Sequence, residues 1–134
     1  MGFSTVAATA IIGISLLIGV ELIVSTTIPS IEDMHDSYDK MKDRSIEQMQ
    51  TDITITNAVY VLPDTLLSVV NTGSESINTT NCNILINGSS KSFTCNVNFI
   101  HPEQTAIFSI SERTYSGDII KIITPNGVSD YHTF

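Results

Sequence analysis

The chain has 134 residues, of which 42% are hydrophobic and 15% are charged, and its net charge is -8 at pH 7. This composition excludes a chain that is disordered throughout and a protein that crosses a membrane many times. Six basic residues against fourteen acidic ones are a poor basis for binding nucleic acid, which requires clustered cations. Behind an apolar N-terminal segment, the remaining residues suffice for one compact domain of roughly a hundred residues.

The N-terminal segment is apolar enough to lie in a membrane. No Asp, Glu, Lys or Arg occurs from Met1 to Val20, and the run from Leu22 to Ile31 is again uncharged. A helix over Phe3–Ile28 is long enough to cross roughly 30 Å of hydrocarbon. A cleaved signal peptide would have a basic region before a shorter apolar core, and neither is clear here. We therefore predict that residues 1–28 form an uncleaved transmembrane anchor helix.

Glu21 lies inside this apolar run, where an ionised carboxylate is costly. Such a group usually faces a protein partner or water, so Glu21 is a candidate contact to another transmembrane helix. Two other interpretations stay open: the membrane boundary falls just after Glu21, or its carboxyl group is protonated.

Residues 29–51 are predicted to form a helical stalk. Pro29 is expected to mark a kink or a restart of the helix where the chain leaves the membrane. One apolar stripe with helical spacing follows, formed by Ile31, Met34, Tyr38 and Met41. The stripe can pair with a second copy in a homodimer or rest on the chain's own domain. His35 and Asp39 share a helix face, but two such residues without a third ligand favour a solvated ion pair over a metal site.

The last segment, residues 52–134, is predicted to be an extracytoplasmic all-β domain with an antiparallel sandwich fold. Short runs rich in Val, Ile, Thr, Phe and Tyr alternate with turn residues, which is typical of antiparallel strands. Turn residues such as Pro, Gly and Asn lie between the runs. About seven strands are expected, near Ile53–Val61, Thr65–Asn71, Cys82–Asn87, Ser90–Val97, Thr105–Ser111, Asp118–Thr124 and Val128–His132.

Two cysteines are placed so that they can form a disulfide. A two-residue loop of Gly88 and Ser89 joins the strands on either side and places Cys82 opposite Cys95. Alternation along the ladder makes this a non-hydrogen-bonded pair, in which the two chains approach more closely. A disulfide there would contribute roughly 2 to 3 kcal/mol if unstrained. Two buried free thiols are the alternative.

A second register competes with the first. A type I′ turn at Asn87-Gly88 shifts the partners by two residues, so that Cys82 meets Phe93. We prefer the first register, because the second places Ile84 opposite Lys91. Both registers give the same faces. The face predicted to be buried carries Cys82, Ile84, Ile86, Phe93, Cys95 and Val97, and the face predicted to be wet carries Asn83, Ser92 and Thr94.

Two glycosylation sequons favour an exterior location for this domain. They begin at Asn78 and at Asn87, which are the candidate glycosylation sites. A disulfide also belongs to an exterior compartment. The basic residues that follow the apolar run are too distant from it to decide the orientation by charge. We therefore predict a single-pass protein of the cytoplasmic membrane, with its C-terminal domain outside.

No catalytic motif is present in the sequence. His35, His101 and His132 are scattered, and none belongs to a zinc, nucleophile or phosphate-binding motif. Two cysteines alone do not make a zinc site. We expect no enzyme activity, no catalytic or cofactor-binding residues, no cofactor and no metal, and instead a domain that binds other proteins.

Three segments carry a resemblance to the archaellum accessory protein family FlaF, also called ArlF. They are Met1-Gly2-Phe3-Ser4 before the apolar helix, Val70-Asn71-Thr72-Gly73, and the run from Gly117 to Val128. The resemblance covers most of the chain. It implies an immunoglobulin-like sandwich outside the cytoplasmic membrane that binds the surface-layer protein and acts as a stator of the archaeal rotary motor.

The resemblance also implies a FlaG-like partner and a homodimer, whereas Glu21 and the cysteine pair are not associated with the family. A type IV pilin-like filament subunit is an alternative, because Gly2-Phe3 is similar to the processing junction of such proteins. Against it, no basic residue precedes Gly2, and Ala7 stands where pilins typically have Glu. A FlaG-like filament-forming component and an unrelated adhesin are further alternatives.

Overall fold

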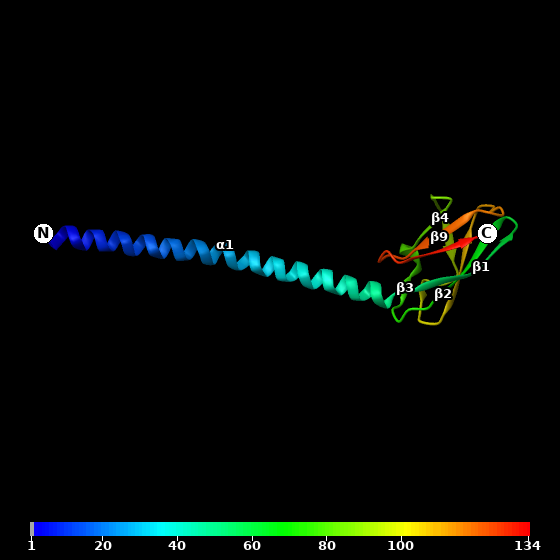
Figure 1. Ribbon diagram of the computed structural model, residues 1–134, viewed down its shortest axis with the longest axis horizontal. Coiled ribbons are helices and arrows are strands. Elements are labelled where there is room, and N and C mark those ends of the chain that lie inside the picture. The colour runs from blue at the N-terminus through cyan, green and yellow to red at the C-terminus, as the bar shows by residue number, and fades with distance from the viewer. Residues whose placement is uncertain (1) are drawn as a thin grey trace. The chain divides into compact units, whose positions relative to one another are not determined.

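The computed structural model describes residues 2–134. The chain divides into two compact units, Met1–Lys42 and Asp43–Phe134. The first unit is helical, and the second combines the last residues of the same helix with a β domain (Figure 1). The predicted boundaries between anchor, stalk and domain, at residues 28 and 51, remain predictions.

One helix, α1 (Gly2–Gln50), accounts for the whole N-terminal part. It continues through Pro29 without a break, so the expected restart of the helix there does not occur. Every residue of α1 is exposed, including the apolar side chains of its first half. By length and composition, α1 is the helix among residues 2–134 that can cross a membrane. Lipid would cover these apolar side chains at a lower free energy than water.

The β domain consists of antiparallel strands in two four-stranded sheets and a short two-stranded ladder. In order across the first sheet lie β1 (Ile53–Val61), β2 (Asp64–Asn71), β8 (Thr105–Ile110) and β6 (Phe93–Cys95). The second sheet contains, in order, β10 (Ser129–Thr133), β9 (Ile119–Ile123), β4 (Asn83–Ile86) and β5 (Ser89–Lys91). The ladder pairs β3 (Ile77–Asn78) with β7 (Phe99–Ile100), and a 3-10 turn, η1 (Thr79–Asn81), follows β3.

The predicted fold class, an N-terminal helix followed by a β-sandwich, is confirmed. Each of the seven predicted strands coincides with an observed one, and β1 has the predicted bounds. The run Ser90–Val97 is an exception in one respect, because it forms two strands, β5 and β6, in different sheets. The short strands β3 and β7 were not predicted.

The core lies between the two four-stranded sheets and follows the two-residue period of the strands. Leu67, Val69 and Phe108 of the first sheet and Ile120 and Ile122 of the second are at most 1% exposed. Burial of each such side chain stabilises the fold by about 1.5 to 3 kcal/mol. The ring of Phe108 also meets Phe93 edge to face, with centroids 5.3 Å apart.

The hairpin of β4 and β5 has the second of the two registers considered, so the preferred register is wrong. Ile86 pairs with Ser89 and Ile84 with Lys91, and the turn is formed by Asn87 and Gly88. Their φ angles are 51° and 83°, and a type I′ turn requires both to be positive. Asn and Gly adopt this conformation more readily than the Gly-Ser pair expected.

The objection to this register was the position of Lys91 opposite Ile84. The structure removes the objection, because Lys91 Nζ lies 2.6 Å from Glu112 Oε2 and the side chain of Lys91 is partly exposed. β5 is the last strand of its sheet, so the ammonium group reaches solvent and a carboxylate without entering the core.

The two cysteines are therefore not cross-strand partners. Cys82 precedes β4, whereas Cys95 lies on β6 and pairs with Phe108 of β8. The predicted alternation of faces is nevertheless observed, with Cys82 buried, Cys95 half-buried and Thr94 between its neighbours exposed. Both cysteines are free thiols in the structure. The disulfide remains a prediction.

Alkylation of the thiols tests this prediction. Burial, and secondarily the neighbouring Cys95, raise the pKa of Cys82 to about 11. At pH 8 roughly one Cys82 thiol in a thousand is then ionised, so iodoacetamide should modify Cys82 far more slowly than the half-buried Cys95. Mass spectrometry of timed samples measures both rates. If the disulfide is present, neither cysteine reacts until a reductant is added.

Candidate functional site

The end of α1 is joined to the β domain by backbone hydrogen bonds. The last carbonyl groups of a helix have no partner within the helix. Here the carbonyl oxygen of Gln50 accepts hydrogen bonds from the N–H groups of Ser74, at 2.8 Å, and Glu75, at 3.2 Å. The chain just after the helix is held by similar bonds. The carbonyl oxygen of Asp52 accepts hydrogen bonds from the N–H groups of Thr72 and Gly73, both at 3.0 Å. Residues 72–75 thus cap the helix.

Asn71 fixes the shape of this capping loop. Its side chain is completely buried, and its amide donates hydrogen bonds to the carbonyl oxygens of Glu75, at 2.7 Å, and Ile100, at 2.9 Å. Its own side-chain oxygen accepts from the N–H of Gly73 at 3.0 Å. Three elements, the end of β2, the capping loop and β7, therefore meet on one amide group.

Gly73 leaves no room for a side chain. A Cβ atom at this position would lie 2.4 Å from both the nitrogen of Asp52 and the carbonyl oxygen of Gln50. Both are backbone atoms of the junction, so the conflict cannot be relieved by rotating a side chain. The close approach of the capping loop to the end of α1 requires glycine at this position.

We therefore expect Gly73→Ala to destabilise the β domain by about 2 kcal/mol or more, through displacement of the capping loop. Thermal unfolding followed by circular dichroism measures the change. Gly88→Ala is the matched control, since its Cβ would meet nothing within 4 Å and only the positive φ of 83° opposes it. That control should cost about 1 kcal/mol. Equal losses for both variants would contradict the steric account.

A second loop holds the other side of the helix end. Asn126 donates from its amide to Thr51 Oγ1 at 2.6 Å and more weakly to the carbonyl oxygen of Glu47 at 3.4 Å. Gln48 Nε2 in turn donates to the carbonyl oxygen of Asn126 at 2.7 Å. The last turn of α1 and the residues just after it are thus bound from two sides, by residues 72–75 and by the turn between β9 and β10.

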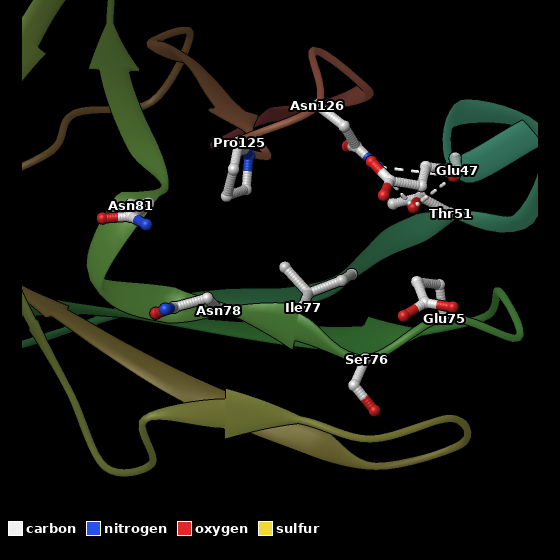
Figure 2. Close-up of a pocket in the computed structure, with 9 residues that line it drawn as sticks. All are labelled: Glu47, Thr51, Glu75, Ser76, Ile77, Asn78, Asn81, Pro125 and Asn126. Atoms are coloured by element: carbon white, nitrogen blue, oxygen red, sulfur yellow. Dashed lines mark hydrogen bonds between the residues drawn. The ribbon is translucent and has the colours of Figure 1, made fainter. Parts of the chain in front are cut away.

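A cavity of about 210 Å³ lies beside this junction (Figure 2). Figure 2 shows Pro125 and Ile77 on facing sides of it, with Asn126 and Thr51 joined by a hydrogen bond at one end. It is lined by Glu47, Thr51, Glu75, Ser76, Ile77, Asn78, Asn81, Pro125 and Asn126. Within residues 2–134, no three His, Cys, Asp or Glu side chains gather closely enough to hold a metal ion.

The outer face of the first sheet is a broad surface with little charge. Among the outward positions of β1, β2, β8 and β6, Asp64 is the one ionisable residue, and it accepts a hydrogen bond from Ser109 at 3.0 Å. Val59, Val61 and Ile107 on this face are between 42% and 53% exposed. An uncharged sheet face with exposed aliphatic side chains is suited to binding another protein. We call it the neutral face.

At one edge of the β domain, a carboxylate group joins the two four-stranded sheets. The backbone N–H of Ile55, on β1, donates to Asp130 Oδ2 of β10 at 2.8 Å. The contact connects the outer strands of the two four-stranded sheets. It also lies close to the bulge in β1 after Ile55.

Three residues that the sequence analysis singles out lie on α1. Glu21, His35 and Asp39 are all exposed on α1. Glu21 as an intramembrane helix contact therefore remains a prediction. His101 lies on the β domain, where its Nδ1 is 2.9 Å from Ser76 Oγ.

The two predicted glycosylation sites differ in their surroundings. Asn78 caps η1, and its side-chain oxygen accepts from the N–H and the hydroxyl of Thr80. Asn87 is held on both sides, because its amide donates to Asp118 at 2.8 Å and its oxygen accepts from Ile119 N at 3.0 Å. Glycosylation of either residue remains a prediction.

Asp118 is bound in its ionised form. Its carboxylate accepts hydrogen bonds from the N–H of Tyr115, at 2.7 Å, and from Asn87. The bond from Tyr115, and secondarily that from Asn87, lower the pKa of Asp118 below its usual value. This carboxylate therefore orders the loop between β8 and β9.

The junction itself was not predicted from the sequence. The residues of the junction belong to two segments that carry the family resemblance, Val70-Asn71-Thr72-Gly73 and the run from Gly117 to Val128, but nothing in the sequence indicates that these segments contact the helix end. The available signal is an asparagine followed two residues later by glycine, at the end of a predicted strand. That pattern is common in ordinary turns as well.

Comparison with known proteins supports the fold. No protein-family model matches the chain, and no curated protein sequence matches it. The archaellum periplasmic stator protein FlaG from Sulfolobus acidocaldarius is structurally similar, with a TM-score of 0.53 and 20% identity over 63% of this chain and 99% of that one. The archaellum periplasmic stator protein complex of FlaF and FlaG from the same organism gives a TM-score of 0.51 and 19% identity, over 61% and 87%. The chain thus shares the immunoglobulin-like sandwich of these proteins.

Proposed function

We propose that the chain is a non-enzymatic stator component of the archaeal flagellum, the archaellum, anchored in the cytoplasmic membrane by α1. The observation that carries the proposal is a sandwich with the fold of archaellum stator proteins, attached without a linker to an apolar helix. In this role the β domain lies outside the cytoplasmic membrane, in the cell envelope. No cofactor takes part.

The junction gives this proposal a physical mechanism. A stator must pass the reaction torque of the motor from the membrane to a fixed structure. The last turn of α1 is bound by the loop 72–75 and by Asn126, so a load on the β domain is opposed by several hydrogen bonds at once. A flexible linker at this point would let the domain turn without transmitting torque.

The fixed structure in this proposal is the surface layer. The neutral face is the favoured contact for a surface-layer protein, because it combines exposed aliphatic side chains with many hydroxyl groups. Loss of apolar area from water supplies affinity there, and the hydroxyl groups supply hydrogen bonds. Substitutions of Val59 or Ile107 by Asp would place a charge in such a contact.

Two further partners belong to the same proposal. A solved neighbour is a complex of FlaF and FlaG, which favours a FlaG-like archaellum protein as the partner of a FlaF-type chain. The exposed stripe of Ile31, Met34 and Tyr38 on α1 favours a homodimer through the helix. The stripe can be tested by replacing Met34 with Glu and measuring the mass of the detergent-solubilised protein.

A FlaG-like component is the second candidate function, since FlaG alone is also a structural neighbour. A filament subunit of the type IV pilin kind would bury its apolar helix in a polymer rather than in lipid. Fractionation separates the candidates, because a stator remains with the membrane and a filament subunit is recovered with sheared filaments.

A pull-down from native cell envelopes tests the proposal directly. We would use the full-length protein in detergent, because residues 43–50 of α1 form one compact unit with the β domain. Recovery of the surface-layer protein is expected, and Val59→Asp should reduce it by about tenfold or more. Recovery of only filament subunits would favour the second candidate, and no recovery of envelope protein would contradict the stator role.

A further inference from the structure

The end of the β domain away from the junction carries an exposed cluster of aromatic, apolar and cationic side chains. β1 starts next to the end of α1, and Tyr60, near its other end, lies roughly 24 Å further along the strand. Figure 1 shows the turn between β1 and β2 at this far end of the domain. Leu62 in that turn is 80% exposed, and Tyr115 in the loop between β8 and β9 is 60% exposed.

Arg113 is held between two aromatic rings in this cluster. Its Cζ atom lies 5.4 Å from the ring centroid of Tyr60 and 5.1 Å from that of Tyr115. Both contacts are favourable cation–π interactions. Because the two rings restrict the guanidinium group, less side-chain entropy is lost when its N–H groups bind a ligand.

The carboxylates nearest in sequence to Arg113 are bound by other groups. Glu112 forms an ion pair with Lys91, and Asp118 accepts hydrogen bonds from Tyr115 and Asn87. No carboxylate among residues 2–134 lies within ion-pair distance of Arg113. Arg113 is exposed, so its donors face solvent and are available to a carboxylate from outside.

The surroundings of Arg113 identify the chemistry of the ligand. Tyr and Arg beside exposed aliphatic side chains are the composition of protein–protein hot spots. A phosphate-rich surface, whether nucleic acid or anionic lipid, requires several clustered cations. Lys91, the other cation that lines the hollow beside Arg113 and Tyr115, is already paired with Glu112. A single carboxylate flanked by apolar groups fits this site better.

We propose that Tyr60, Leu62, Arg113 and Tyr115 form a protein-binding site that takes an Asp or Glu side chain of a partner. Arg113 donates two parallel hydrogen bonds to the carboxylate, while Leu62 and Tyr115 cover apolar side chains beside it. This inference rests on the proposed function only in placing the partner in the cell envelope. It names a contact separate from the neutral face.

Binding of the full-length protein in detergent to isolated native envelopes tests the site. Arg113→Gln should weaken binding roughly thirtyfold, as expected for a hot-spot side chain. Arg113→Lys should restore only part of the affinity, because Lys keeps the charge without the planar fork. Lys121→Gln is the matched control, since it removes a cation from another ring contact, 4.7 Å from Tyr131, and should bind as the unmodified chain does.

A chemical treatment of the envelopes identifies the ligand group. Envelope carboxylates are converted to neutral amides with a carbodiimide and methylamine before binding is measured. The treatment should weaken binding of the unmodified chain and leave binding of Arg113→Gln almost unchanged, because each change removes the same interaction. Thermal unfolding of each variant shows that the fold is intact.

The outcomes separate this site from the stator role. The site is wrong if Arg113→Gln binds like the unmodified chain, or if amidation weakens both proteins equally. If binding depends on Arg113 and on carboxylates but the recovered protein is not the surface-layer protein, the site stands and the proposed function fails. If the unmodified chain does not bind envelopes, both fail.

Discussion

Replacement of Asn71 by Asp is expected to destabilise the β domain by about 3 to 5 kcal/mol at pH 7. The amide of Asn71 donates to the carbonyl oxygens of Glu75 and Ile100, and it is completely buried. A carboxylate in the same place would direct a negative charge at two acceptors without a donor between them. Domains of this size have a total stability of roughly 5 to 15 kcal/mol, so the variant should be close to unfolding.

The loss should decrease in acid. Burial raises the pKa of the new carboxyl group in the folded state above the unfolded value of about 3.9. The group is therefore protonated in both states below that value, and the charge penalty appears only as the pH rises through this range. A protonated carboxyl group can also donate to one of the two carbonyl oxygens.

Urea unfolding at pH 7 and pH 4 measures this difference. Asn83→Asp is the matched control, because Asn83 is exposed and its side-chain oxygen accepts from Ser90 Oγ at 2.7 Å, a bond that Asp retains. The control should lose less than about 0.5 kcal/mol. If Asn71→Asp were no more destabilised than the control, the role assigned to Asn71 would be wrong.

Under the proposed stator role, insertion of Gly-Ser-Gly between Gln50 and Thr51 is expected to abolish swimming while binding to the envelope persists. The insertion separates the carbonyl group of Gln50 from the N–H groups of Ser74 and Glu75 and allows free rotation between α1 and the residues that follow. The core residues of the sandwich lie beyond the insertion and keep their contacts. Swimming speed and envelope pull-down of the full-length variant are measured in parallel.

The same insertion between Gly88 and Ser89 is the control. That turn is exposed, and nothing lies within 4 Å of the Cβ position of Gly88. The control should swim and bind the envelope. Normal swimming of the variant with the insertion after Gln50 would contradict torque transmission through the helix, whereas loss of envelope binding would indicate damage to the domain itself.

The strands were predictable because each four-stranded sheet buries one face. β1 begins with Ile-Thr-Ile-Thr, and in β8 buried residues alternate with exposed or half-buried ones, as expected for an antiparallel sheet with one buried face. The same alternation does not reveal which sheet a strand joins. Phe93 and Cys95 face the core whether their strand pairs with β4 or with β8. The pattern of buried residues therefore does not reveal that the chain passes from one sheet to the other between β5 and β6.

The register of the β4–β5 hairpin and the contacts of the helix end could not be predicted, for a different reason. Each depends on a partner far away in the sequence. Lys91 is acceptable opposite Ile84 because Glu112 is close in space. Asn71 and Gly73 have the properties of ordinary turn residues until the carbonyl group of Gln50 is placed beside them. The local sequence indicates that a segment forms a turn, but it does not indicate what the turn binds.

The side chains of Lys91 and Asp130 also have a consequence for how the protein associates with its copies. An outer strand with free backbone groups is a template for adding a strand from another molecule. On β5, the charged side chain of Lys91 would have to enter the apolar interior of any extended sheet, and on β1 the N–H of Ile55 is already occupied by Asp130. At these two edges, copies crowded on one membrane are thereby hindered from joining sheet to sheet.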